Sequence, residues 1–288
     1  MNTHHIILGD CIEGMKTLSD KCVQTCITSP PYFGLRDYQG GEAEIGQEDT
    51  VEGYVQKMVE VFREVRRILR NDGTLWLNLG DSYMSAKNCA PPPQTVANGN
   101  ARSMPTDFIP ANRKDQDGLK TKDLIGIPWR VALALQADGW YLRQDIIWSK
   151  PNPMPESVAD RCTKSHEYIF LLSKKPHYYY DHEAVKENAV GGEEKKNKRS
   201  VWTVNSKGYK GAHFAVYPEN LIEPCVLAGC PQDGTVFDPF TGSGTTAVVA
   251  LKNGRNYIGT ELNPEYVKIA EARIKESVPQ TLEEILND

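Results

Sequence analysis

Short apolar runs alternate with segments of helical period along most of this 288-residue chain. We expect the runs to form strands and the intervening segments helices, because the two structures bury their apolar residues with different periods. This alternation is typical of a mostly parallel α/β sheet wound with helices on both faces. The expected strands cover residues 4–8, 23–27, 74–79, 140–148, 167–173, 236–238 and 256–260, and the expected helices residues 51–69, 128–135, 218–227, 247–253 and 264–274.

Breaks in the periodicity suggest how these elements are joined. Asn71-Asp72-Gly73 is a typical stop signal for the preceding helix, and Tyr178-Tyr179-Tyr180 is a candidate extension of the sheet. Residues 84–122 have no periodicity and contain three consecutive prolines, so they predict a long mobile insertion. We therefore expect one domain over residues 1–288, interrupted by this insertion.

The composition is that of a globular chain with a sizeable core. Hydrophobic residues make up 40% and charged residues 25%, and the formal net charge is -5. No apolar run approaches membrane-spanning length, and the first residues lack the layout of a signal peptide. Seven cysteines without framework spacing fit reduced thiols, so a cytoplasmic location is expected. Cys22 with Cys26 and Cys162 with His166 lack a convincing second half, and no metal site is predicted.

The segment Thr28-Ser29-Pro30-Pro31-Tyr32 follows the apolar run over residues 23–27. Two consecutive prolines remove two backbone donors and fix the chain direction, so the strand must end in a rigid loop. That loop presents a hydroxyl, carbonyl groups and an aromatic ring, which suits a planar group with an amino edge. Alone, the pattern fits a plain turn beside a core strand equally well.

A second strand-ended loop lies near the other end of the chain. Asp238-Pro239-Phe240-Thr241-Gly242-Ser243-Gly244-Thr245 follows a strand and leads into a helix, whose first N–H groups are free. Asp238 places a carboxylate where a phosphate would otherwise bind, which favours a ligand with a cationic amino group. Glu261 ends the next strand, the position from which an acid binds ribose hydroxyls in nucleotide folds. A ligand with an amino acid at one end and a nucleoside at the other is S-adenosylmethionine.

The two loops together resemble the motifs of the β group of amino-group DNA methyltransferases. The segment from Asp238 to Thr246 is similar to their cofactor-binding motif, and Ser29-Pro30-Pro31-Tyr32 to their catalytic motif. The order of the two motifs matches the circularly permuted arrangement of this group. The resemblance implies a Rossmann-like S-adenosylmethionine-dependent methyltransferase fold. It also implies a cofactor site formed by the residues Asp10, Asp238, Pro239, Phe240, Gly242, Ser243, Gly244, Thr245 and Glu261.

The permutation also makes physical sense. After the last helix, a doubly wound sheet needs another parallel strand, and residues 4–8 can supply it. This strand would bring Asp10 beside Glu261, and in the family the corresponding acid contacts the adenosine of the cofactor. A capping aspartate in a surface turn is the alternative interpretation of Asp10.

The resemblance implies methyl transfer to an exocyclic amine of a base flipped out of duplex DNA. The amine is expected to donate its hydrogens to the Ser29 side chain and the Pro30 carbonyl, while Tyr32 stacks on the base and Pro31 stiffens the loop. Serine at position 29 favours cytosine N4 over adenine N6 as the target. Methylation of RNA or of a protein amide, and a non-catalytic DNA- or cofactor-binding module, are the remaining alternatives.

Residues 186–210 form a locally basic stretch with interleaved Trp202 and Tyr209. Such a stretch suits the phosphate backbone of DNA, although a solvated charged loop has the same composition. We expect residues 181–211 to take part in target recognition, with phosphate contacts from Lys195, Lys196, Lys198 and Arg199. Double-stranded DNA is thus the predicted partner. A second copy of the chain, in a homodimer, and a cognate restriction endonuclease are the further candidate partners.

Overall fold

The computed structural model describes residues 2–34, 44–84, 118–189, 191–192, 194–206 and 217–277. The predicted insertion, apart from its two ends, and Tyr209 in the basic stretch lie outside these residues. The elements, in chain order, are β1 (His4–Leu8), α1 (Cys11–Lys16), β2 (Val23–Thr28), α2 (Val51–Ile68), β3 (Leu69–Leu79), α3 (Ile127–Ala137), β4 (Tyr141–Ser149), β5 (His166–Ser173), β6 (Glu187–Asn188), β7 (Lys195–Lys196), β8 (Val201–Thr203), α4 (Glu219–Gly229), β9 (Thr235–Asp238), α5 (Thr245–Lys252), β10 (Asn256–Glu261) and α6 (Pro264–Ser277).

The described strands form an eight-stranded sheet in the order β1-β10-β9-β2-β3-β5-β4-β8. The first five strands run parallel, whereas β5 is antiparallel to both β3 and β4. The prediction of a mostly parallel α/β sheet is therefore confirmed. The reversed direction of β5 matters for the site, because it brings the start of that strand to the edge where the parallel strands end.

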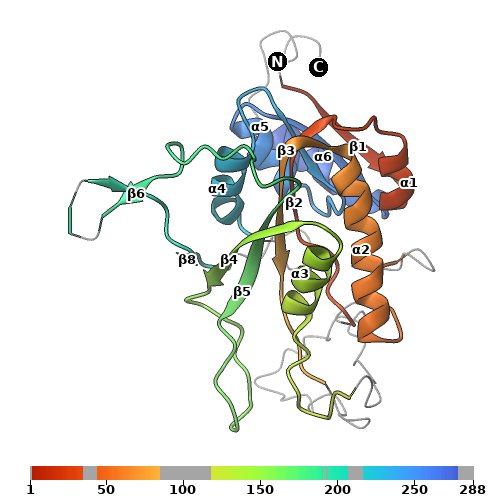
Figure 1. Cartoon of the computed structure of the whole chain (residues 1–288), viewed down its shortest axis with the longest axis vertical. Coiled ribbons are helices and arrows are strands. Elements are labelled where there is room, and N and C mark those ends of the chain that lie inside the picture. The colour runs from red at the N-terminus through yellow and green to blue at the C-terminus, as the bar shows by residue number, and fades with distance from the viewer. Residues whose placement is uncertain are drawn as a thin grey trace, which may run out of the picture.

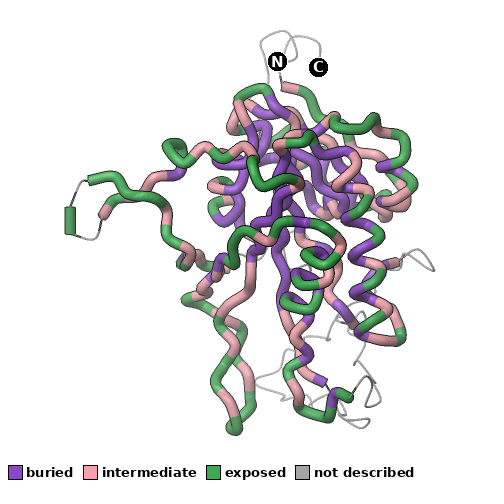
Figure 2. Tube along the Cα trace, in the orientation of Figure 1, coloured by how far each residue is buried: buried purple, intermediate pink, exposed green. Residues whose placement is uncertain are grey.

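Helices cover both faces of the sheet, as a doubly wound fold requires (Figure 1). Helices α1, α2 and α3 pack against one face, in a core that includes Tyr54, Phe62 and Phe170. Helices α4, α5 and α6 pack against the other face, in a core that includes Trp76 and Val248. Figure 2 shows this buried centre enclosed by half-buried and exposed segments.

The N-terminal strand completes the sheet at the edge beside β10. Strand β1 pairs in parallel with β10, and Leu8 lies opposite Glu261. The Gly9 backbone N–H continues this pairing with a 2.8 Å hydrogen bond to the Glu261 carbonyl. The predicted position of the N-terminal strand beside the last strand is confirmed.

Three local features differ from the sequence-based expectation. Helix α2 ends at Ile68, and Asn71-Asp72-Gly73 belongs to β3, where the pairing register with β2 shifts between Val23 and Thr25. The predicted stop signal is thus an irregularity within a strand, because Leu69 already adopts the extended backbone.

Residues Tyr178-Tyr179-Tyr180 form no strand, so the proposed extension of the sheet there is wrong. The Tyr179 backbone N–H bonds instead to the Asp72 carbonyl at 2.9 Å, and the Tyr180 ring stacks on Trp76. The short helix α1 had no clear sequence signal, because a helix of six residues is too short to show a period.

Within the described residues, no helix is both long and apolar enough to cross a membrane. The same part of the chain holds no group of three or more His, Cys, Asp or Glu side chains that could bind a metal ion.

Candidate active site

The two predicted loops lie side by side at the carboxyl edge of the parallel strands. Strand β2 pairs in parallel with β9, with Thr25 opposite Val236 and Cys26 opposite Phe237. Both strands therefore end at the same edge, and the loops that follow them are neighbours. The Thr28 hydroxyl, directly before Ser29, donates a 2.7 Å hydrogen bond to Asp238 Oδ1 and ties the loops together.

Asp238 is the buried centre of this junction, with only 1% of its surface exposed. Its carboxylate accepts hydrogen bonds from the Thr246 hydroxyl at 2.5 Å, the Phe240 backbone N–H at 3.0 Å and the Tyr217 hydroxyl at 3.4 Å. Burial raises the pKa of Asp238, although these hydrogen bonds oppose the rise. A contact between this carboxylate and a ligand amino group stays a prediction. The structure gives the side chain a second task, which is to join β2, β9 and α5.

The raised pKa of Asp238 predicts a pH-dependent contribution to stability. The folded protein holds this proton more tightly than the unfolded chain, so the contribution decreases as the pH rises from the ordinary aspartate pKa through the folded value. Asp238→Asn cannot ionise and lacks this dependence. We expect the unfolding free energy of the wild type, relative to Asp238→Asn, to fall with rising pH in urea titrations. A constant difference across that window would contradict the burial argument, and exposed Asp20→Asn serves as the control.

The glycine turn between β9 and α5 is shaped by two residues with positive φ. Gly242 has φ +52 and Gly244 has φ +79, a region that favours glycine. A Cβ on Gly244 would lie 2.8 Å from the Ala270 Cβ, so the turn packs directly on α6. By contrast, a Cβ on Gly242 would meet only the Phe240 carbonyl at 3.9 Å. The turn is therefore tight on its α6 side and has free space at Gly242.

Glu261 braces the turn from the end of β10. Its Oε2 accepts a 2.7 Å hydrogen bond from the Gly242 N–H, and its Oε1 accepts a 2.9 Å bond from the Asn263 N–H. Burial raises the pKa of Glu261, and both backbone donors oppose the rise. Each carboxylate oxygen retains acceptor capacity beyond these two bonds.

The other predicted cofactor residues surround the same turn. Asp10 caps α1, with Oδ1 accepting from the N–H groups of Ile12 and Glu13, while Oδ2 has no partner among the described residues. Both interpretations of Asp10 thus remain compatible, since the cap uses one oxygen. The Pro239 carbonyl accepts a 2.7 Å bond from the Thr260 hydroxyl.

Arg273 of α6 is a contact that sequence analysis missed. Its Nη1 bonds to the carbonyl and hydroxyl of Ser243 and to the Thr245 hydroxyl, at 2.7, 2.8 and 3.0 Å. The side chains of Ser243 and Thr245 are buried and face this guanidinium. These contacts give both residues a structural part in the turn, while each hydroxyl keeps its own O–H as a donor, so a contact with a ligand stays a prediction. A lone arginine in an amphipathic helix carries no sequence signal for such a contact.

Helix α2 packs against the Ser29–Tyr32 loop. The Tyr54 hydroxyl donates a 2.9 Å bond to the Pro31 carbonyl, and the Tyr54 ring lies 5.4 Å from that of buried Phe33. Ser29 is half-buried, and no described residue donates a hydrogen bond to the Pro30 carbonyl. The loop is thus rigid, yet the hydroxyl of Ser29 and the carbonyl of Pro30 can still accept hydrogen bonds.

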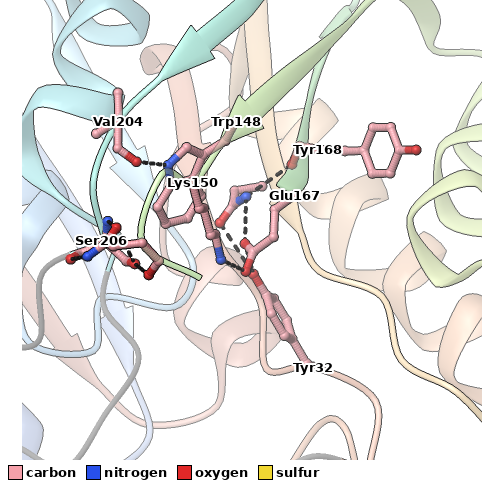
Figure 3. A network of polar contacts seen from close by, with 9 residues as sticks. Tyr32, Trp148, Lys150, Glu167, Tyr168, Val204 and Ser206 are labelled. Atoms are coloured by element: carbon pink, nitrogen blue, oxygen red, sulfur yellow. Dashed lines mark hydrogen bonds and ion pairs between the residues drawn. The ribbon is translucent and has the colours of Figure 1, made fainter. Parts of the chain in front are cut away.

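A polar network that the sequence did not predict surrounds the Tyr32 hydroxyl (Figure 3). Tyr32 donates to Glu167 Oε2 at 2.7 Å, the Asn78 amide donates to the same oxygen at 3.2 Å, and Lys150 pairs with Oε1. The proline-rich loop that begins at Lys150 therefore borders the site. Only the antiparallel direction of β5 brings Glu167 to this edge.

None of the four residues predicted to contact phosphates takes part in the polar network around Tyr32. Lys195 and Lys196 are exposed on β7, in a hairpin that projects away from the body of the molecule (Figure 1). Lys198 and Arg199 both pair with Glu187 of β6, and Lys198 also lies over the Trp202 ring. Lys196 pairs with Glu194 at 3.6 Å, while Lys195 has no ion-pair partner among the described residues.

Comparison with known proteins places the chain in a family. The family model described as DNA methylase, N6_N4_Mtase, matches residues 23–272. The type II methyltransferase M.SmaI of Serratia marcescens is 52% identical over 270 residues, which cover 93% of this chain and 90% of the relative. The type II methyltransferase M.Cfr9I of Citrobacter freundii is 47% identical over 275 residues, which cover 96% of this chain and 89% of the relative.

Two solved structures share the fold. The PvuII DNA methyltransferase (cytosine-N4-specific) aligns with a TM-score of 0.70 at 20% identity, over 100% of this chain and 91% of its own. TTHA0409 from Thermus thermophilus, complexed with S-adenosyl-L-methionine, aligns with a TM-score of 0.66 at 21% identity, over 97% of this chain and 96% of its own. The extent of the family match and the identity to the type II methyltransferases lead to one conclusion: the chain belongs to the N6_N4 family of DNA methylases.

Proposed function

We propose that this protein is a site-specific DNA methyltransferase that transfers a methyl group from S-adenosylmethionine to the N4 amine of a cytosine flipped out of duplex DNA. The observation that carries the proposal is the Thr28–Asp238 hydrogen bond, which fixes the Ser29–Tyr32 loop against the glycine turn. A loop suited to a planar amine is thereby held next to a turn suited to an amino-acid nucleoside.

The residues around the glycine turn fit S-adenosylmethionine. The remaining acceptor capacity of Glu261, together with Asp10 Oδ2, suits the hydroxyl and amino groups of an adenosine. The space at Gly242 allows a ligand to approach the backbone closely. When bound, the cofactor supplies an electrophilic methyl group on a sulfonium sulfur. Its binding in the solved structure of TTHA0409 supports the same assignment here.

Ser29 and Pro30 are proposed to prepare the target amine. The lone pair of an exocyclic amine is delocalised into the base ring, which makes the nitrogen a weak nucleophile. Hydrogen bonds from the amine to the Ser29 hydroxyl and the Pro30 carbonyl favour a tetrahedral nitrogen and localise that lone pair. Pro31 and Tyr54 hold the loop in place, so the residues contribute mainly by positioning.

Four buried cysteines are poorly suited to attack by a thiolate, which supports direct transfer to nitrogen over a mechanism that uses any of them. Burial raises the pKa of Cys11 and Cys230 to about 12 each, and it also raises the pKa of Cys26 and Cys225. These four thiols are therefore neutral at physiological pH, and a neutral thiol is a poor nucleophile.

Two observations favour cytosine over adenine as the target base. Position 29 holds Ser rather than Asp, and the PvuII enzyme that shares the fold is described as cytosine-N4-specific. Adenine N6 is the second candidate, because the family includes methylases of both kinds. The same loop can serve either base, since Ser29 and Pro30 contact only the amino group.

Nucleoside analysis separates these candidates. Purified protein is incubated with methyl-labelled S-adenosylmethionine and duplex DNA, and the DNA is then digested to nucleosides. We expect the label in N4-methyldeoxycytidine. Label in N6-methyldeoxyadenosine would show that adenine is the target base. Label transferred only to RNA or protein would contradict DNA methylation. Absence of transfer to any substrate would favour a non-catalytic module.

We also propose that residues 181–211 contact the DNA backbone through the projecting β6–β7 hairpin and the residues after it. Replacing Lys195, Lys196, Lys198 and Arg199 by Gln should reduce the salt dependence of DNA binding, by about 0.9 in the log–log slope for each phosphate that is no longer neutralised. Lys195 should account for the largest share of this change, because Glu187 pairs with Lys198 and Arg199 and Glu194 pairs with Lys196.

The measurement is DNA affinity at a series of salt concentrations. Lys57→Gln and Lys268→Gln are matched controls, since both lysines pair with helix-surface glutamates away from the hairpin. An unchanged salt slope in the fourfold variant would show that these four residues do not contact the DNA backbone.

The type II relatives suggest the biological setting. We infer that the protein acts in the cytoplasm within a restriction-modification system, with an endonuclease of the same recognition site as its cognate partner. DNA methylated by the protein should then resist cleavage by that endonuclease, whereas unmethylated DNA should be cut.

A further inference from the structure

The carboxylate of Glu167 holds the hydroxyl of Tyr32 in place. Glu167 Oε2 accepts the 2.7 Å bond from Tyr32 and the 3.2 Å bond from the Asn78 amide, and Asn78 Oδ1 lies 3.4 Å from the same hydroxyl. Asn78 is itself fixed by a 3.0 Å bond to the Tyr168 carbonyl. The Tyr32 hydroxyl thus faces two acceptors, Glu167 Oε2 and Asn78 Oδ1, whose positions are fixed by other contacts.

The members of this network come from four neighbouring strands. Tyr32 follows β2, Asn78 lies near the end of β3, Glu167 lies at the start of β5 and Lys150 follows β4. Asn78 lies opposite Ile169, and Trp148 lies opposite Glu167. The sheet itself therefore fixes the spacing of the network, which makes it more rigid than a set of loop contacts.

The Tyr32 ring has little room to reorient. A Cβ on Gly80 would lie 2.5 Å from Tyr32 Cε2 and 3.1 Å from Cζ, so the ring packs closely against the backbone at the end of β3. One side of the ring is therefore limited by Gly80, and its hydroxyl end is limited by Glu167. Together these two contacts define the plane of the ring.

Lys150 keeps Glu167 in its role as an acceptor. Its ammonium group pairs with Oε1 and lies 4.1 Å from the centre of the Trp148 ring. The side chains of Lys150 and Glu167 are only 18% and 15% exposed, so each ion depends on the other for compensation. Burial and the charge of Glu167 raise the pKa of Tyr32 well above its ordinary value, which keeps its hydroxyl protonated.

We propose that Glu167 is a positioning residue for methyl transfer, which sets the plane of the Tyr32 ring and thereby the depth at which the stacked base reaches Ser29 and Pro30. Lys150 and Asn78 hold Glu167 in the required orientation. The proposal rests on the proposed function, in which Tyr32 stacks on the target base. Misplacement of a reacting group by about 1 Å can cost about 100-fold in rate, so a contact of this kind affects turnover strongly.

The test is a double-mutant cycle of Tyr32→Phe and Glu167→Ala. Each single change should lower kcat roughly 10- to 100-fold while leaving the Kd for S-adenosylmethionine unchanged. Because both changes break the same contact, Glu167→Ala should have little further effect on kcat in the Tyr32→Phe background. Glu167→Gln retains an acceptor oxygen for the hydroxyl and should have a higher kcat than Glu167→Ala.

Glu64→Ala is the matched control, since Glu64 is a partly buried carboxylate that pairs with Arg67 on α2. This variant should keep the kcat of the wild type. Wild-type kcat in Glu167→Ala, or effects of the two changes that simply multiply, would overturn the proposal.

The same cycle measured by thermal unfolding reports the Tyr32–Glu167 contact without any need for turnover. If the wild type fails to methylate DNA, the proposed function fails, and the unfolding cycle still tests the contact. Absence of coupling in both cycles would contradict the inference alone, provided that the wild type is active.

Discussion

Ser29→Ala is expected to reduce methyl transfer to DNA by about 100- to 1,000-fold, the usual cost of removing one preorganised hydrogen-bonding group from an active site. The hydroxyl is proposed to accept a hydrogen from the target amine, and alanine leaves that hydrogen without a partner. The contacts from Tyr54 to Pro31 and from Thr28 to Asp238 do not involve the Ser29 side chain, which interacts within the described loop only with the Tyr32 hydroxyl. The fold and the affinity for S-adenosylmethionine should therefore stay unchanged.

Single-turnover methylation of DNA measures this effect without a contribution from product release. Ser173→Ala is a suitable control, because Ser173 lies at the opposite end of β5 and its hydroxyl bonds to the Lys175 carbonyl. This control is expected to lose some stability and to keep its rate of transfer. A wild-type rate of methyl transfer in Ser29→Ala would show that the serine takes no part in the reaction.

Glu261→Ala is expected to weaken the binding of S-adenosylmethionine by about 100-fold. Two hydrogen bonds from ribose hydroxyls to a carboxylate contribute about 3 kcal/mol together, and each 1.4 kcal/mol corresponds to about tenfold in affinity. The substitution also removes the acceptor for the Gly242 N–H, so the glycine turn loses its brace. The lost ribose contacts and the loosened turn both lower the affinity for S-adenosylmethionine.

Titration calorimetry with S-adenosylmethionine measures this loss directly. Glu265→Ala provides the control, because Glu265 lies nearby at the start of α6 but is exposed, and its ion-pair partner among the described residues is Lys268. An affinity for S-adenosylmethionine equal to that of the wild type in Glu261→Ala would place the cofactor elsewhere. Glu261→Gln should show an intermediate affinity, since the amide retains one acceptor oxygen.

The sequence predicts the parallel part of the fold and the two central loops well. Apolar runs locate β1, β2, β9 and β10, and the polar residues at their ends mark one edge of the sheet. The pairing of β1 with β10 was also predictable, because the last helix leaves a place for one more parallel strand. These features depend on local pattern and on general rules of sheet winding.

Features that depend on three-dimensional contacts were not predictable. The roles of Glu167 and Lys150 follow from the antiparallel direction of β5, which periodicity does not reveal. The buried carboxylate of Asp238 is satisfied by hydroxyl groups of β2, α5 and Tyr217, which are far apart in the sequence. The stop signal at Asn71-Asp72-Gly73 failed because the same residues also suit a strand with an irregular pairing register.

The most direct test of the proposed function is sequencing of DNA from cells that express the protein, with a readout that distinguishes 4-methylcytosine from 6-methyladenine. A site-specific cytosine-N4 methyltransferase predicts 4-methylcytosine at one position of a single recurring sequence, and unmodified DNA in cells that express Ser29→Ala. Recurring 6-methyladenine would contradict the assignment to cytosine. DNA with neither modification, from cells that contain folded wild-type protein, would contradict DNA methylation itself.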